Sequence, residues 1–123
     1  MYGIPKSLDL SQVVGKSTTQ FRVGGFDLQF SFGEPPHQVD FTIESVVDLF
    51  RAGELFAHWE AGKWPDPGFI DIMGIEVTRW KVPNDRSIVL EFANGIEMHL
   101  EENDTPYESM QIWFEGNPVP VII

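Results

Sequence analysis

Three side chains capable of metal or acid–base chemistry, Glu97, His99 and Glu101, alternate along one segment of the chain. In an extended strand, alternate side chains point to the same face, so two carboxylates and an imidazole would lie side by side. Such groups are ligands for transition metals and would suit a metal-dependent hydrolase. A complete site needs a further ligand that the sequence does not identify. The same pattern is also typical of a solvent-exposed strand face, so the hydrolase is kept as an alternative.

No other arrangement of reactive residues in the sequence indicates an enzyme. The remaining histidines are scattered, and cysteine is absent, which excludes thiol catalysis, disulfide bonds and thiolate zinc sites. Residues 15–18 read GKST, but a phosphate-binding loop would also need a glycine at position 10, where the chain has Leu10. We therefore predict a protein that is not an enzyme and needs no cofactor.

Acidic residues dominate the composition of the chain. Its 123 residues include 19 acidic and 8 basic ones, which gives a net charge of −11 at pH 7. This charge repels nucleic acid and anionic lipid surfaces and favours encounter with a basic protein. The chain does not begin like a secretory signal, and its longest apolar run is too short to cross a membrane. We expect a cytoplasmic protein whose partner is another protein.

The densest acidic cluster lies between residues 101 and 108 and includes an aromatic residue. Two tryptophans in the 58–68 segment either cap the core or present a contact surface. Charge favours encounter and aromatic side chains supply contact area, so this combination predicts a binding patch for a basic protein. The alternative is an acidic loop without a specific role. The predicted partner-binding residues are Trp59, Trp64, Glu101, Glu102, Asp104, Tyr107 and Glu108.

Two segments of the chain, residues 14–53 and 73–116, have similar sequences and are joined by residues 54–72. The spacing of glycine and aromatic residues is shared between them, with Phe26 opposite Ile88. After a turn at Gly24–Gly25, Phe26 is expected to begin an alternating strand that continues through Phe32. The matched positions are Gly15, Thr19, Val23, Leu28, Phe30 and Gly33 with Gly74, Thr78, Val82, Leu90, Phe92 and Gly95. We interpret the segments as two tandem β-meander repeats.

Apolar and polar residues alternate in both repeats with the period of a half-buried strand. The fold class predicted is mainly β: two antiparallel meanders forming a sandwich or barrel with short helical turns, in a single domain spanning residues 1–123. Residues 44–57 fit either a strand or an amphipathic helix, and periodicity does not decide between them. The predicted core is Phe21, Val23, Leu28, Phe30, Trp80, Val82, Leu90, Phe92, Met98 and Leu100.

The second repeat resembles a family of small β-rich immunity proteins found beside bacterial polymorphic toxins, including contact-dependent growth inhibition systems. The resemblance is carried by Gly74, Val77, Thr78, Val82, Leu90, Phe92, Gly95 and residues 107–113, YESMQIW. It implies a protein that binds a cognate toxin domain, often a nuclease, and occludes its active site. These motifs are mostly turn glycines and core residues, so they specify a fold more than an activity. A small-ligand-binding β-barrel is the other alternative.

Overall fold

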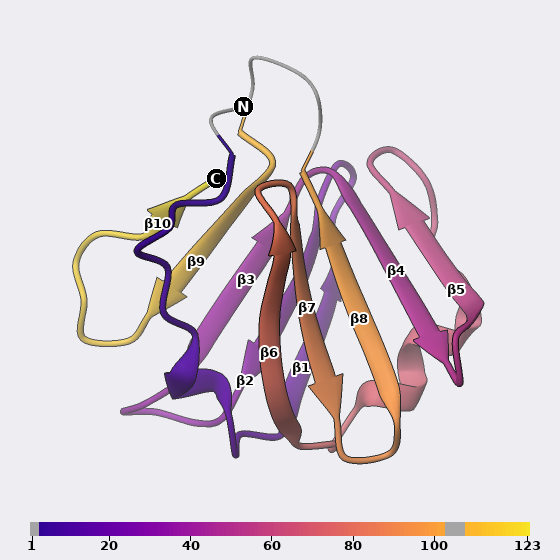
Figure 1. Cartoon of the computed structure of the whole chain (residues 1–123), viewed down its shortest axis with the longest axis horizontal. Helices are drawn as coiled ribbons and strands as arrows, with labels where there is room; N and C mark the ends of the chain where they lie inside the picture. The colour runs from indigo at the N-terminus through magenta and orange to yellow at the C-terminus, as the bar shows by residue number, and fades with distance from the viewer. Residues whose placement is uncertain (1–2, 103–107) are drawn as a thin grey trace.

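The structure, a computed structural model, describes residues 3–102 and 108–123, which form two five-stranded antiparallel sheets packed face to face (Figure 1). The first sheet has the order β1-β2-β3-β9-β10, formed by Thr18–Val23, Leu28–Phe32, Val39–Ile43, Met110–Phe114 and Val121–Ile122. The second has the order β5-β4-β8-β7-β6, formed by Glu54–Glu60, Val46–Arg51, Ile96–Glu101, Ser87–Phe92 and Val77–Asn84. Two short 3-10 helices, η1 (Ser11–Val13) and η2 (Pro67–Ile72), precede β1 and β6. The predicted mainly β sandwich is confirmed, and the barrel alternative is wrong because the sheets do not close on each other.

The two halves of the chain exchange strands between the sheets. β1, β2 and β3 form a meander, but β4 crosses to pair with β8; in the same way β9 leaves the meander of β6, β7 and β8 to pair with β3. The fifth strands follow, so that β5 lies beside β4 and β10 beside β9. Residues 44–57 are therefore not a helix: they contain β4 and the first part of β5, joined by a turn at 52–53. Residues 54–72 are more than a connection, because they contain β5.

Reciprocal backbone hydrogen bonds join the starts of the two halves. Gly15 N–H donates to the carbonyl of Val77 at 2.8 Å, and Gly74 N–H donates to the carbonyl of Thr18 at 2.9 Å. Thr18 N–H to Ile75 O and Val77 N–H to Lys16 O form a second such pair, both at 3.0 Å. Gly15 and Gly74 also share positive φ values of 89° and 75°, which glycine adopts without strain. This two-fold relationship is what a duplicated unit would produce.

The strand pairing revises how the repeats align. Phe30 lies opposite Phe21 in the first sheet, and Leu90 lies opposite Trp80 in the second. If Phe21 matches Trp80, then Phe30 corresponds to Leu90. The sequence alignment instead predicts that Phe30 corresponds to Phe92. A displacement of two residues keeps every side chain on the same face, so an alternating pattern cannot detect it.

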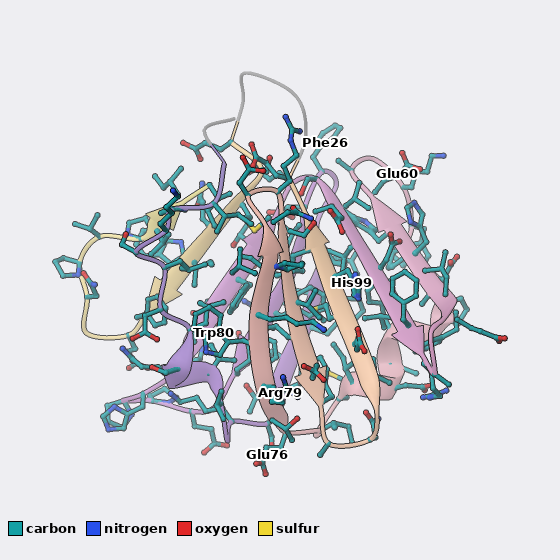
Figure 2. All side chains as sticks on the ribbon, in the orientation of Figure 1. Phe26, Glu60, Glu76, Arg79, Trp80 and His99 are labelled. Carbon is teal, nitrogen blue, oxygen red and sulfur yellow. The ribbon has the colours of Figure 1, made fainter. Side chains whose placement is uncertain are left out.

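The same displacement places Phe26 outside the strand that it is predicted to join. Gly24 N–H donates to the carbonyl of Asp27 at 2.9 Å and closes a turn before β2 begins at Leu28. Phe26 lies in this turn at the top of the molecule and is 79% exposed (Figure 2). The prediction for Phe26 is wrong because the turn extends beyond the Gly24–Gly25 pair.

Six of the ten predicted core residues are buried, and the other four are half-buried and pack against the core. The buried six are Leu28, Phe30, Leu90, Phe92, Met98 and Leu100. The half-buried four are Phe21, Val23, Trp80 and Val82. These four belong to β1 and β6, which are edge strands and have a neighbour on one side only. Burial is therefore deepest in the central strands of each sheet.

Candidate functional site

Carboxylates gather on the outer face of the second sheet. Val47 and Leu49 in β4 and Met98 and Leu100 in β8 are buried, so the residues that alternate with them point outwards. His99 lies in front of this sheet in Figure 2, and Glu60 lies near its upper edge. We define the acidic face by seven outward side chains, which are Asp48, His58, Glu60, Glu91, Glu97, His99 and Glu101. Arg79 and Lys81 of the edge strand β6 lie beside it on the same outer face of the sheet.

Two carboxylates of the acidic face lie directly opposite each other on neighbouring strands. Glu91 in β7 pairs with Glu97 in β8, and like charges in such positions destabilise a sheet. Arg79 Nε lies 3.5 Å from Glu91 Oε2, but its side chain is 72% exposed, where an ion pair contributes little. Glu97 Oε1 lies 3.1 Å from His99 Nε2. Each of the two carboxylates therefore contacts one basic side chain of the same sheet, Arg79 or His99, while they lie opposite each other.

An aromatic ring lies within the acidic face. Phe50 is opposite Glu97 across β4 and β8, and its half-buried ring packs on the imidazole of His99 at 4.5 Å between centroids. In protein interfaces, an aromatic side chain surrounded by polar residues often contributes a large part of the binding energy. The sequence prediction did not include Phe50, because residues 44–57 fitted both a helix and a strand.

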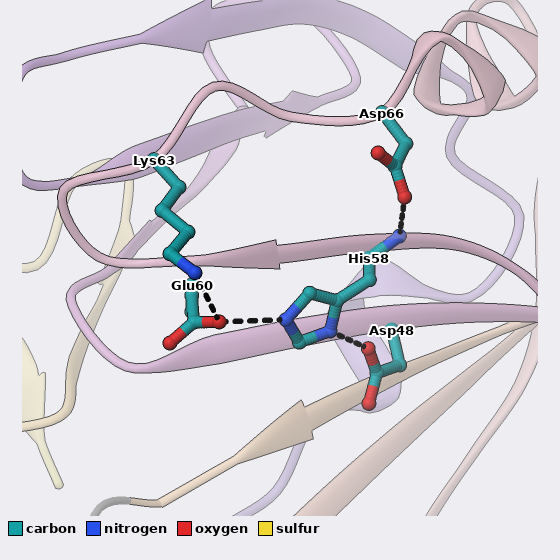
Figure 3. Close-up of polar contacts among 5 residues, drawn as sticks. All are labelled: Asp48, His58, Glu60, Lys63 and Asp66. Atoms are coloured by element: carbon teal, nitrogen blue, oxygen red, sulfur yellow. Dashed lines mark hydrogen bonds and ion pairs between the residues drawn. The ribbon is translucent and has the colours of Figure 1, made fainter.

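His58 is held between two carboxylates at one end of the acidic face (Figure 3). Its Nδ1 lies 2.5 Å from Asp48 Oδ1, and its Nε2 lies 3.3 Å from Glu60 Oε1. Lys63 Nζ lies 3.4 Å from the same Glu60 oxygen. Asp66 Oδ2 accepts the backbone N–H of His58 at 2.9 Å, which occupies a donor on the edge strand β5.

These contacts shift two pKa values in opposite directions. The hydrogen bond with Asp48 raises the pKa of His58 above its ordinary value of 6.5; partial burial opposes this shift, and Glu60 adds to it. The pKa of Glu60 falls below its ordinary value of 4.5 because His58 and then Lys63 hydrogen-bond to its carboxylate. His58 therefore retains its proton to a higher pH than a free histidine.

We predict a pH dependence of stability that comes from His58. Because its pKa is raised on folding, its contribution is fully present below about pH 6.5 and is lost as the pH rises through the raised value. Denaturant unfolding of the wild type and of His58→Gln across this range should show a difference between them that shrinks at alkaline pH. In an NMR titration the midpoint of His58 should lie above 6.5 and fall in Asp48→Asn. A wild-type midpoint at or below 6.5 would contradict this prediction.

The outer face of the first sheet is much less charged. Its strands present mainly amides and hydroxyls, and of its outward strand residues Arg22 and Asp40 carry charge. Arg22 Nε donates to Gln29 at 3.0 Å, and Ser31 Oγ donates to Asp40 at 2.5 Å. The charge of the strands is thus distributed unevenly between the two faces of the sandwich.

The two tryptophans predicted as partner contacts have opposite environments. Trp59 is 1% exposed and belongs to the core, so the prediction that it presents a contact surface is wrong. The reason is strand alternation: within β5, Ala57 and Trp59 point inwards while His58 and Glu60 point outwards. Trp64 is 82% exposed and follows Lys63, which contacts Glu60. Trp64 therefore lies in a loop that borders the acidic face.

The predicted acidic residues do not form one patch. Glu101 belongs to the acidic face and accepts a hydrogen bond from Ser87 Oγ at 2.5 Å. Glu108 instead accepts from Gln111 Nε2 at 2.9 Å, on the outer face of the first sheet. Glu102 Oε1 accepts from the backbone N–H of Gly3 at 3.3 Å and connects the N-terminal segment to the second sheet. The chain changes sheets between Glu101 and Glu108, and this separates them.

Asp104 and Tyr107, the remaining predicted contacts, lie outside the described residues. The carboxylates that the prediction missed as partner contacts, Asp48, Glu60, Glu91 and Glu97, come from four different strands. Asp48 and Glu60 come from one hairpin and Glu91 and Glu97 from another, and only the pairing of β4 with β8, which are distant in sequence, joins the two hairpins. Alternation could assign each of them to an outward face, but not to the same surface.

The metal alternative gains no support from the geometry. Glu97 and His99 contact each other, while Glu101 bonds to Ser87. Within residues 3–102 and 108–123, no group of three or more histidine, aspartate or glutamate side chains is arranged to hold a metal ion. In the same part of the chain, no helix has the length and apolar character that a membrane crossing requires.

Comparisons with protein-family models, with curated proteins and with solved structures find no significant match to this chain. The chemistry of the acidic face is therefore what bears on the function of this chain.

Proposed function

We propose that this chain binds a basic protein through the acidic face, and that it acts as an immunity protein that occludes the active site of a cognate toxin domain in the cytoplasm. The observation that carries the proposal is the concentration of five carboxylates on one sheet face, with Glu91 and Glu97 directly opposite each other. A cationic partner would relieve this repulsion. Binding and stability would therefore both gain from the contact.

A toxin that acts on nucleic acid suits this surface best. Its substrate is a polyanion, so its active site must present cationic groups. A protein with a net charge of −11 is drawn to the same positive field, and association is accelerated by it. Phe50 within the face and Trp64 at its border supply apolar contact area for the bound state.

Co-expression tests the immunity function directly. A toxic domain encoded beside this chain should arrest growth when it is produced alone, and this chain should restore growth when both are produced. Glu97→Lys/Glu101→Lys should lose protection because the face then loses most of its negative charge and places two cations against the cationic partner. Glu34→Lys/Glu44→Lys makes the same change in charge at exposed positions outside the acidic face and should keep it.

Two outcomes would reject the proposal. One is that the adjacent gene encodes no toxic domain that this chain neutralises. The other is that both double variants protect equally well, which would show that protection does not depend on where the negative charge lies.

A further inference from the structure

A recess beside an exposed tryptophan lies at the opposite side of the sandwich from the acidic face. Trp113 in β9 is 39% exposed and lies opposite Asp40 of β3, on the outer face of the first sheet. The recess has a volume of about 380 Å³ and is bordered by Trp113, Asp40, Gln38, Glu115 and Asn117, among others. This volume falls within the range of roughly 300–1,000 Å³ that is typical of small-ligand sites.

Hydrogen bonds fix the polar groups of the recess before any ligand arrives. Ser31 Oγ and Gln38 Nε2 donate to the same oxygen of Asp40, Oδ1, at 2.5 and 2.8 Å. The backbone N–H of Gln38 donates to Glu115 Oε1 at 3.1 Å. Each carboxylate therefore keeps one oxygen, Asp40 Oδ2 and Glu115 Oε2, that accepts no hydrogen bond from the described residues.

No described cation borders the recess, and the nearby Arg22 reaches Asp40 only through the hydroxyl of Ser31. The border of the recess contains two carboxylates and no lysine, arginine or histidine. Arg22, on the same sheet face, bonds to Gln20, Gln29 and Ser31 and forms no ion pair with Asp40. An aromatic face beside two carboxylates without a cation is complementary to a positively charged ligand.

We infer that this recess binds an arginine side chain of a peptide or protein partner. A guanidinium group is planar, so it can stack on the Trp113 ring while its N–H groups donate to Asp40 and Glu115. An ammonium group has no plane to stack and is more strongly hydrated, so lysine should bind less well. An anionic ligand is disfavoured by both carboxylates. This inference does not depend on the acidic face being a binding site.

The probe for the test is the short peptide acetyl-Gly-Arg-Gly-amide, added to the full chain. The Trp113 indole N–H signal should shift on titration, with a Kd of about 1 mM, as expected for one exposed side chain. The same peptide with citrulline, which is neutral but nearly the same shape, should bind at least about tenfold more weakly. The lysine peptide should lie between them.

Matched variants separate the recess from general attraction to an acidic protein. Binding to the variants is followed by the backbone amide signals of Gln38 and Asp40, because Trp113→Ala removes the indole signal. Trp113→Ala should weaken binding of the arginine peptide about fivefold, whereas Trp64→Ala removes a more exposed tryptophan elsewhere and should leave it unchanged. Asp40→Asn should weaken binding about tenfold, and Glu44→Gln, at an exposed position away from the recess, should have little effect. Asp40→Asn changes the charge while keeping an oxygen that can accept from Ser31 and Gln38, so the fold is expected to be retained.

Three results would each overturn the inference. The citrulline peptide could bind as tightly as the arginine peptide, or the Kd could be insensitive to both Trp113→Ala and Asp40→Asn. A neutral oligosaccharide could also shift the Trp113 signal at lower concentration than the arginine peptide, which would assign the recess to a sugar.

Discussion

Replacing Trp59 with alanine is expected to destabilise the protein by about 3–5 kcal/mol, the usual cost of removing a large buried aromatic side chain. Trp59 is 1% exposed and lies opposite Val47, which is fully buried, at the β4–β5 pair. The surrounding side chains would relax only partly into the space left by the indole. Since a domain of this size is stable by about 5–15 kcal/mol, this loss is a large part of the total.

Urea unfolding of three variants provides the measurement and its controls. Trp64→Ala, at an 82% exposed position, should change the free energy of unfolding by less than about 0.5 kcal/mol. Trp59→Phe should cost less than Trp59→Ala, because it keeps a ring and removes an indole N–H that has no hydrogen-bond partner among residues 3–102 and 108–123. Equal losses for Trp59→Ala and Trp64→Ala would contradict the assignment of one ring to the core and the other to the surface.

The two tryptophans also show how much of the structure can be predicted from the sequence. Both lie in a segment expected to connect the repeats, yet one is in the core and the other in a loop. Alternation would have separated Trp59 from its outward neighbours His58 and Glu60 if β5 had been recognised. The register of β5 shifts opposite Leu49 and Phe50, and this irregularity interrupts the simple two-residue period.

The class of fold and most of the core followed from local patterns, whereas the site did not. Alternation assigns a side chain to a face, and turn residues such as Asn94 and Gly95 mark the ends of strands. The exchange of β4 and β9 between the sheets depends on pairing between strands that are distant in sequence, which no local pattern predicts. It brings Asp48 beside His99 and sends Glu108 to the other sheet, so it decides which carboxylates share a surface.

Because Glu91 and Glu97 lie opposite each other, replacing Glu97 with lysine is expected to affect stability and binding differently. In Glu97→Lys, an unfavourable pair of like charges becomes a favourable cross-strand pair, so the free energy of unfolding should stay the same or rise by up to about 1 kcal/mol. The affinity for a basic partner should fall. A loss of binding with no loss of stability would separate a role in recognition from a role in the fold.

The association rate is the quantity most sensitive to this change. For Glu97→Lys/Glu101→Lys, we expect a reduction of about tenfold or more at low ionic strength, measured by stopped flow against the cognate toxin domain. The difference from the wild type should shrink as salt is added, because the Debye length falls to about 10 Å at 0.1 M. Glu34→Lys/Glu44→Lys carries the same net charge, and its rate should stay closer to that of the wild type. If both double variants slowed association equally at every salt concentration, net charge alone would set the rate and the placement of carboxylates on one sheet face would have no part in recognition.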